Sequence, residues 1–255
     1  MIPQTQPKIY ISNNIVVAEN VIPEQRCNAI IEYQKRYKAM NVTNGGVGGH
    51  HIKNQIQSEE DKKNIEKNAK IKIDKDGVPT NEDIRSCEVS WIIASDKFST
   101  EVIHQCNDIM TQVNHSYYGF DVWRPEPIQF THYTFHEDKE VKDHYDWHID
   151  SSILARGNNP FDRKLSMSIQ LSPSDSYTGC NLEFPDHKNF MDGNKDNAGV
   201  NAQTGETITS KDLAVVLKKQ GTAILFPSFA HHRVSPIESG ERYCLVNWMQ
   251  GPRWR

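Results

Sequence analysis

Hydrophobic residues recur at helical spacing in two segments of the first half of the chain. The first segment follows Pro23, a residue that suits the first turn of a helix, and the second covers about residues 99–117. Each segment carries one apolar stripe, which we expect to pack on a sheet. The stripes consist of Cys27, Ile30, Tyr33 and Tyr37 in the first segment and of Ile103, Cys106, Ile109, Met110, Val113 and Tyr117 in the second.

From Pro125 onward the pattern changes to short apolar runs separated by Gly, Pro, Asn and Asp. The runs are IQFTHYTF, HYDWHID, RKLSMSIQLS, NLEFP, LAVVL, GTAILFP, HHRVSPI and RYCLVNWM. Many short strands with such turn residues between them are typical of a β-sandwich or barrel. Residues 9–17 and 85–93 also predict strands, so the chain combines helices and strands.

Two segments differ from the rest in amino-acid composition. Residues 41–84 are first glycine-rich and then dense in charges of both signs, which predicts a mobile loop or a peripheral insertion. This insertion is either a lid over a substrate or a neutral elaboration of the surface, and we expect its His50 and His51 to be solvated. Residues 186–210, rich in Asn, Asp, Gly and Thr, predict a long surface loop.

Composition and charge narrow the class of protein. The 255 residues are 36% hydrophobic and 24% charged, with a net charge of −4 and no long basic run. These values speak against a dedicated nucleic-acid or membrane-surface protein. Five cysteines without a CxxC pair indicate reduced intracellular thiols. The sequence shows neither a secretory signal nor an apolar stretch of roughly 20 residues, so we expect a cytoplasmic protein.

The segment HYDWHID concentrates imidazoles and carboxylates within a predicted strand. His148 and Asp150 are two positions apart, and this spacing places both side chains on one face of a strand. A second imidazole, from either His231 or His232, lies far along the chain on another predicted strand. Two histidines and one carboxylate form the facial triad of non-haem Fe(II) enzymes, which leaves positions open for other ligands. A structural zinc site would use four ligands, typically including cysteine.

Spacing alone leaves alternatives to two of these residues. His144 and Asp146 repeat the same two-residue spacing on the same strand. His231 precedes His232 directly, and because adjacent strand residues point to opposite faces, only one of the two can reach the metal. On the same reasoning, the intervening residues of the first strand should form its opposite, packing face; these are Tyr145, Trp147 and Ile149.

Five ordered blocks of the sequence carry a resemblance to a known family. They are WHID, RKLSMSIQLSPSDSYTGCNLEF, GTAILFPS, HRVSPIESGER and NWMQG. Together they resemble the prolyl 4-hydroxylase-like 2-oxoglutarate and Fe(II)-dependent dioxygenases, particularly the bacterial and phage PKHD-type hydroxylases. The resemblance covers residues 125–255 and, more faintly, residues 85–91. It implies an α+β fold with a double-stranded β-helix (jelly-roll, cupin-like) core and N-terminal supporting helices. Residues 1–124 would support a catalytic core of residues 125–255 within one integrated domain.

The resemblance also implies the roles of individual residues. It makes His148, Asp150 and His232 the metal ligands, which leaves His144 and Asp146 at the strand entry or outside the ligand set. Arg242 corresponds to the arginine that holds the far carboxylate of 2-oxoglutarate. A planar guanidinium suits that task because it binds a carboxylate through two parallel hydrogen bonds.

Other residues of the implied cosubstrate pocket are less strictly assigned. Tyr133 resembles a tyrosine commonly found at the pocket, and Trp248 would form a wall. Gln170 lies on a strand whose polar face should line the interior, although the resemblance leaves its role open. Gly179 matches the first glycine of a Gly-Gly pair, and Cys180 replaces the second, a change expected to affect the turn and not the chemistry.

The implied reaction is hydroxylation of an unactivated C–H bond with Fe(II), 2-oxoglutarate and O2, with ascorbate as an optional reductant. Asp150 argues for hydroxylation, since related halogenating enzymes lack this carboxylate. The expected substrate is a prolyl residue in a peptide or protein, or a free amino acid. The alternative is a non-catalytic metal- or ligand-binding β-helix module, against which Arg242 argues. A nucleic-acid demethylase is disfavoured by the acidic balance and by the lack of a second pocket arginine near Arg242.

Overall fold

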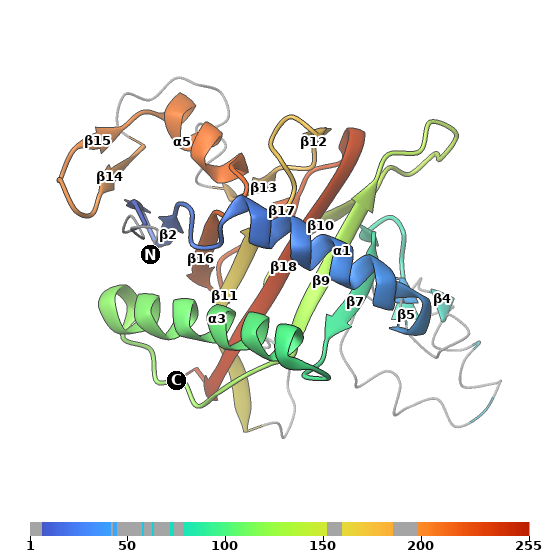
Figure 1. The fold of residues 1–255 in the computed structure, drawn as a ribbon, viewed down its shortest axis with the longest axis horizontal. Coiled ribbons are helices and arrows are strands. Elements are labelled where there is room, and N and C mark those ends of the chain that lie inside the picture. The colour runs from blue at the N-terminus through green and yellow to red at the C-terminus, as the bar shows by residue number, and fades with distance from the viewer. Residues whose placement is uncertain are drawn as a thin grey trace.

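Two sheets lie at the centre of the protein, and two long helices cover the outer face of the larger one (Figure 1). The computed structural model describes residues 7–41, 43–44, 58, 63, 72–73, 79–151, 160–185 and 198–254. His50, His51 and most of the predicted 41–84 insertion lie outside these residues. Among the described residues, no helix is both long enough and apolar enough to cross a membrane.

The larger sheet contains twelve strands among the described residues, all paired antiparallel. Its order is β15-β14-β1-β2-β16-β11-β18-β9-β7-β3, and β8 and β12 also pair with β18. The bounds are β1 Ile9–Ser12, β2 Ile15–Ala18, β3 Thr43–Asn44, β7 Glu88–Ile92, β8 Arg124–Pro125, β9 Ile128–Thr134, β11 Phe161–Gln170, β12 Tyr177–Gly179, β14 Gly199–Asn201, β15 Thr207–Ile208, β16 Ala223–Pro227 and β18 Ile237–Pro252. Strands from residues 1–124 and from residues 125–255 therefore share one sheet.

The smaller sheet has the order β13-β17-β10-β6 and faces the inner side of the larger one. Its strands are β6 Arg85–Ser86, β10 His144–His148, β13 Leu182–Glu183 and β17 His232–Val234. A separate short pair joins β4 Lys72–Ile73 and β5 Pro79–Thr80.

Both predicted helices are present. They are α1 Glu24–Asn41 and α3 Lys97–Val113, the latter continued by a π-helical turn, η2 Asn114–Tyr118. Asp96 caps α3 by accepting a hydrogen bond from the Ser99 amide, while the Ser99 hydroxyl accepts one from the Asp96 amide. This reciprocal pair satisfies two amides at the helix start, which fixes where α3 begins.

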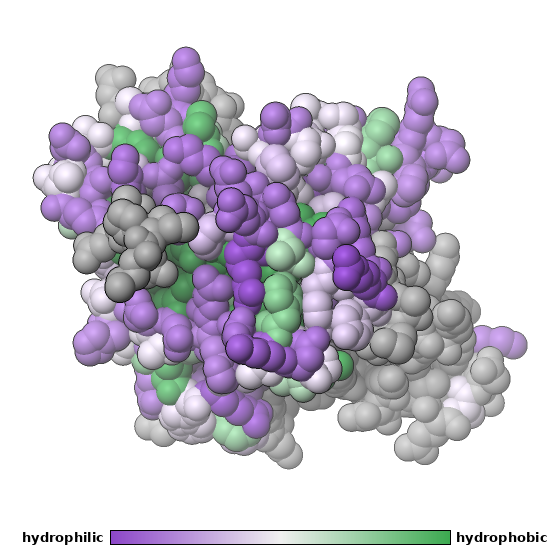
Figure 2. Space-filling model, viewed as in Figure 1, coloured by the Kyte–Doolittle hydropathy of each residue, from purple (hydrophilic) through white to green (hydrophobic). Residues whose placement is uncertain are grey.

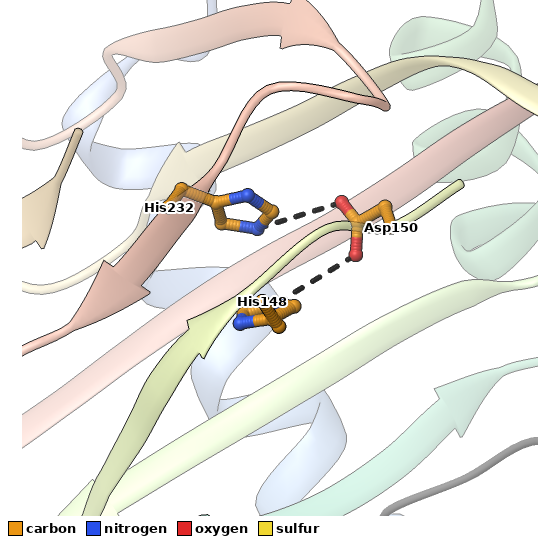
Figure 3. A group of neighbouring side chains, drawn as sticks. All are labelled: His148, Asp150 and His232. Carbon is orange, nitrogen blue, oxygen red and sulfur yellow. Dashed lines mark ion pairs between the residues drawn. The ribbon is translucent and has the colours of Figure 1, made fainter. Parts of the chain in front are cut away.

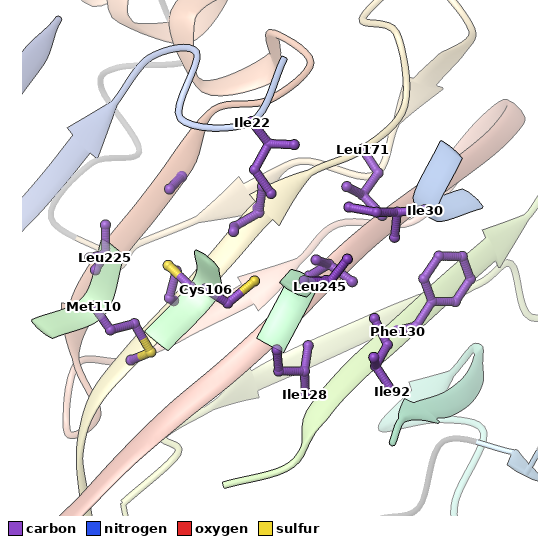
Figure 4. Close-up of a cluster of buried hydrophobic side chains, with 14 of the residues drawn as sticks. Ile22, Ile30, Ile92, Cys106, Met110, Ile128, Phe130, Leu171, Leu225 and Leu245 are labelled. Atoms are coloured by element: carbon purple, nitrogen blue, oxygen red, sulfur yellow. The ribbon is translucent and has the colours of Figure 1, made fainter. Parts of the chain in front are cut away.

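The main hydrophobic core lies between these helices and the larger sheet (Figure 4). Ile30 of α1 and Met110 of α3 are fully buried against strand residues such as Leu245. In Figure 2, hydrophobic residues of this face show mainly in the strip between the two helices, while the helices themselves present hydrophilic side chains. The predicted apolar stripes are therefore confirmed as core-facing over most of their length, but the last residue of each, Tyr37 and Tyr117, is exposed, because both lie at the far ends of their segments, beyond the buried positions.

Strand β11 separates this core from the space between the sheets. Leu165, Met167 and Ile169 belong to the helix-covered core. The alternate residues Ser166 and Gln170 are also buried, which confirms that this strand turns a polar face inward instead of toward solvent. A second cluster, with members including Tyr133, Tyr177, Phe184, Phe226, Val234 and Ile237, fills the apolar part of that inner space.

Two predictions of strands were wrong. The run LAVVL, expected as a strand, lies in helix α5 Ser210–Lys218, because Thr209 caps its start by accepting from the Asp212 amide. A five-residue apolar run cannot be assigned to strand or helix from periodicity alone. Residues 9–17 form two strands, β1 and β2, instead of one, with Asn13 at a left-handed φ of 51° in the turn between them.

The predicted loop of residues 186–210 contains secondary structure in its second part. Strands β14 and β15 form a hairpin, and β14 pairs with β1 at the edge of the larger sheet. Residues 186–197 lie outside the described part of the chain. The polar composition of this segment hid the hairpin because its strands carry few apolar residues.

Candidate metal centre and adjacent pocket

His148, Asp150 and His232 converge between the two sheets (Figure 3). Each offers one ligand atom, and these three atoms lie within 4.8 Å of one another. Asp150 Oδ1 is 3.8 Å from His148 Nε2, and Asp150 Oδ2 is 3.6 Å from His232 Nε2. His148 and His232 are direct cross-strand partners in the antiparallel pair of β10 and β17. Such partners carry their side chains on the same face about 5 Å apart, which explains why the two imidazoles meet.

Backbone carbonyls fix the tautomer of both imidazoles. The Nδ1–H of His148 donates to the carbonyl oxygen of Asp146 at 2.7 Å, and that of His232 donates to the carbonyl of Ala230 at 2.9 Å. Both Nε2 atoms therefore carry their lone pairs toward the shared point. Burial, helped by repulsion from His232, lowers the pKa of His148 to about 3. His148 is thus a neutral ligand at neutral pH.

Asp150 is held by buried hydroxyl and backbone groups. The Ser166 hydroxyl donates to Asp150 Oδ2 at 2.7 Å and lies 2.9 Å from the hydroxyl of Ser228. The Ser228 carbonyl accepts from the amides of both Asp150 and Ser151, which ties the end of β10 to the end of β16. Burial disfavours the charged carboxylate, but the nearby His232 and Arg163 outweigh this and lower the pKa of Asp150 to about 2.

The alternative ligands lie elsewhere. Both ring nitrogens of His144 face backbone carbonyls, those of Lys142 and Asp83, at 2.9 and 3.1 Å. Asp146 is exposed and accepts from the Trp147 amide, and His231 is exposed as well. Among the described residues, His148, Asp150 and His232 form the one group with the spacing of a metal site. The donor set, two imidazoles and one carboxylate around a single point, fits a ferrous ion.

Tyr145 was expected on the packing face and is instead part of the site. A register shift in the pairing of β10 with β17 falls between Tyr145 and His148. The Tyr145 ring consequently stacks on the His148 imidazole, with centroids 3.6 Å apart and planes 14° apart. Trp147 lies apart from this stack and contacts the guanidinium of Arg233 at 4.9 Å. Nothing in the residue pattern signalled the bulge, so sequence reasoning missed this residue.

Arg242 lies in the same interior, toward the other end of β11. Its side chain is 1% exposed, and its Nε–H donates to Gln170 Oε1 at 3.0 Å. The guanidinium also lies 5.5 Å from the ring centroid of Tyr133. Among the described residues, no carboxylate forms an ion pair with Arg242. A buried guanidinium without a counter-charge is costly unless a ligand supplies one, so this geometry fits the free carboxylate of an oxoacid.

The turn after β12 brings Cys180 to this guanidinium. Gly179 has a φ of 68°, and a Cβ at this position would lie 2.4 Å from the Pro236 carbonyl oxygen, which accounts for the glycine. Cys180 follows with a φ of 49°, and its Sγ lies 3.9 Å from Arg242 Nη1. The replacement of a second glycine therefore puts a thiol beside Arg242, in contrast to the expectation that it would affect the turn alone.

Trp248 and Arg163 lie at the metal end of the interior. Trp248 is the cross-strand partner of Ser166, the residue that donates to Asp150. Its indole is buried under the guanidinium of Arg163 at 3.8 Å. Arg163 in turn makes two hydrogen bonds to the carboxylate of Glu126, at 2.8 and 2.6 Å. Trp248 thus lies next to a residue that contacts Asp150, and its role as a wall of the cosubstrate pocket stays a prediction.

Part of the sequence matches a known protein family and its members. Residues 128–250 match the family described as the 2OG-Fe(II) oxygenase superfamily. A PKHD-type hydroxylase of Hyphomonas neptunium is 31% identical over 108 residues, which cover 42% of this chain and 38% of that protein. A PKHD-type hydroxylase of Synechococcus sp. (strain CC9605) is 30% identical over 106 residues, or 42% and 36% of the two chains. The matched part therefore spans less than two fifths of either relative.

Solved structures of related fold extend over nearly the whole chain. A viral collagen prolyl hydroxylase from Paramecium Bursaria Chlorella virus-1, in complex with 2OG, has a TM-score of 0.53 at 14% identity and covers 94% of this chain and 97% of its own. A prolyl hydroxylase from Trichoplax adhaerens, in complex with a hypoxia inducible factor peptide fragment, has a TM-score of 0.56 at 13% identity, with 93% and 83% covered. The double-stranded β-helix is thereby confirmed. Residues 128–250, just under half of the chain, thus match the 2OG-Fe(II) oxygenase superfamily in sequence, and the chain shares its fold with solved prolyl hydroxylases.

Proposed function

We propose that the protein is a 2-oxoglutarate- and Fe(II)-dependent dioxygenase that hydroxylates an unactivated C–H bond. In this proposal, His148, Asp150 and His232 hold the iron, and Arg242 binds the far carboxylate of 2-oxoglutarate. One observation carries it. A three-ligand group and a buried guanidinium without a carboxylate partner among the described residues lie in the same interior between the sheets. A purely structural metal site would have no use for that guanidinium.

The residues of the chain have separate tasks in this reaction. A bound Fe(II) supplies the O2 chemistry that couples decarboxylation of the oxoacid to hydroxylation. His148 stays neutral, Asp150 stays anionic, and the backbone carbonyls keep both Nε2 atoms directed at the iron. Arg242 orients the oxoacid, with Gln170 holding the guanidinium in plane and Tyr133 against its side. Trp248 bounds the space at the metal end.

A prolyl residue in a peptide or protein is the substrate class we favour, with a free amino acid as the second possibility within the same reaction. The support comes from proteins of similar fold, which include a viral collagen prolyl hydroxylase, a prolyl-4-hydroxylase of Pseudomonas putida and the peptide complex from Trichoplax adhaerens. Because these are 13–14% identical to this chain, they share its fold and leave its substrate to experiment.

An anaerobic titration tests the cofactor part of the proposal. Adding Fe(II) and then 2-oxoglutarate to the wild type should produce a weak visible charge-transfer band, because the oxoacid chelates the iron. A succinate-release assay over pools of proline-containing peptides, free amino acids and oligonucleotides then tests the substrate class. If the protein binds iron but does not bind 2-oxoglutarate and releases no succinate with any pool, it is a non-catalytic metal-binding module instead.

A further inference from the structure

Arg85 is a buried arginine of the smaller sheet that lies outside the region matching the family, residues 128–250. We propose that Arg85 is a positioning residue for His148, acting through the ring of Tyr145. This inference rests on the proposed function, because it gives His148 a metal to bind. It assigns a task at the metal centre to the segment before the catalytic core.

The first contact of this chain of residues joins Arg85 to Tyr145. The two are direct cross-strand partners in the pairing of β6 with β10. Arg85 is 9% exposed, and its guanidinium carbon lies 4.5 Å from the centroid of the Tyr145 ring. Its Nε–H donates to Cys87 Sγ at 3.1 Å, which fixes the plane of the guanidinium over the ring. A cation over an aromatic face is more favourable when it is desolvated, as the buried Arg85 is here.

The second contact joins Tyr145 to His148. The two rings are nearly parallel, with centroids 3.6 Å apart. The Tyr145 ring is therefore held between a guanidinium on one side and a metal-binding imidazole on the other. On a regular strand, residues three positions apart point to opposite faces, so this stack depends on the bulge between Tyr145 and His148. The amide of Asp146, inside the bulge, donates to the Ile84 carbonyl at 2.7 Å and so anchors it to the segment that carries Arg85.

His148 depends on this stack more than His232 depends on its neighbours. The hydrogen bond from Nδ1–H fixes one atom of each imidazole but still permits the ring to tilt about it. His232 contacts two aromatic rings, those of Phe226 at 4.6 Å and Phe184 at 6.1 Å, which are tilted by 58° and 35° to its plane. The parallel contact to His148 comes from Tyr145. We conclude that Arg85 and Tyr145 set the plane in which His148 presents Nε2 to the metal.

The test measures Co(II) binding to the purified full chain by visible absorption, which reports both affinity and ligand geometry and requires no turnover. Arg85→Met should weaken Co(II) binding about tenfold and change the shape of the absorption band, as expected when a group supporting a metal-bound histidine is removed. Arg85→Lys, which keeps a cation, should recover most of the loss. Tyr145→Phe, which keeps the stack, should lose less Co(II) affinity than Tyr145→Leu, which removes it.

Arg124→Met is the matched control. Arg124 also lies 4.5 Å over an aromatic ring, that of Phe161, but it is exposed, and its side chain donates a hydrogen bond to Gln250 instead of contacting Tyr145. This variant should keep wild-type affinity and spectrum. Melting of the metal-free variants shows whether each one folds. If Arg85→Met does not fold, Tyr145→Leu takes its place and has to show the same loss relative to Tyr145→Phe.

Two outcomes separate the inference from the proposed function. Wild-type Co(II) affinity and spectrum in folded Arg85→Met, or in folded Tyr145→Leu, overturn the positioning role and leave the dioxygenase proposal intact. Failure of the wild type itself to bind Co(II) or Fe(II) overturns the proposed function instead.

Discussion

His148 and His232 stand directly opposite each other in the antiparallel pair of β10 and β17, although 84 positions separate them in the chain. This register brings two imidazoles within reach of one ion, and it leaves His144 and His231 outside. Asp150 joins them because it follows His148 just beyond the end of β10, where the Ser228 carbonyl holds its amide. The metal site is thus a property of strand pairing.

Single substitutions of the histidines should separate ligands from neighbours. His148→Ala and His232→Ala each remove one of the three proposed ligands, so Fe(II) affinity should fall by more than roughly 100-fold, beyond the loss typical of outer groups. His144→Ala and His231→Ala should retain it. Anaerobic Fe(II) titration measures all four affinities. Loss of binding in His144→Ala with retention in His148→Ala would show that the wrong pair had been assigned.

Replacing Arg242 should affect cosubstrate binding and spare the fold. For Arg242→Met we expect KM for 2-oxoglutarate to rise on the order of 100-fold, because a desolvated carboxylate loses its charged partner. Arg242→Lys should be intermediate, since an ammonium cannot make two parallel hydrogen bonds.

The unliganded Arg242→Met protein should melt no lower than the wild type, because the change removes a buried charge that lacks a carboxylate partner among the described residues. Arg26→Met, which breaks the partly exposed pair with Glu101, is the control and should leave KM unchanged. An Arg242→Met variant with unchanged KM would contradict the assignment.

Ser166 should matter for metal affinity. Ser166→Ala removes the hydrogen bond to Asp150 Oδ2, so the carboxylate can rotate, and Fe(II) affinity should drop about 10- to 100-fold. Isothermal titration under argon measures this. Ser168→Ala changes a buried serine two positions along the same strand, and no hydrogen bond joins that residue to Asp150. Equal affinities in the two variants would mean that Ser166 does not orient the carboxylate.

Acid should destabilise the metal-free protein partly through His148. The folded-state pKa of His148 is lowered to about 3, whereas an unfolded histidine titrates near ~6.5. The unfolded chain therefore takes up a proton that the folded chain does not, and stability falls as the pH decreases from about 6.5 toward about 3. Thermal melts over this range should show a shallower decline in His148→Asn. An identical pH slope in both proteins would contradict the lowered pKa.

Truncating a buried side chain in the helix-covered core should lower the stability of the protein. Leu245 is fully buried on β18 among residues of the main core. Leu245→Ala should lower the free energy of unfolding by roughly 2–5 kcal/mol. Urea denaturation of the metal-free protein measures this. Val215→Ala, a truncation of an exposed residue on α5, should change stability by less than about 0.5 kcal/mol.

Much of the fold and site followed from the sequence because the relevant information is local. The two apolar stripes predicted α1 and α3, and the alternation in β11 placed Ser166 and Gln170 on an inward polar face. The two-residue spacing of His148 and Asp150 and the ordered blocks further along predicted the donor set and the family. The local pattern predicted a strand for residues 213–217, but they form part of a helix whose start is capped by Thr209.

Tertiary structure decided what local patterns leave open, because pairing partners and bulges depend on contacts between distant segments. Residue spacing alone left His144 and His231 as alternatives, and the register of β10 against β17 is what brings His148 and His232 together. Only the bulge in that pair turns Tyr145 from the packing face onto the imidazole. Residue types and their spacing supplied the chemistry, while the long-range pairing of short strands determined which of those side chains meet.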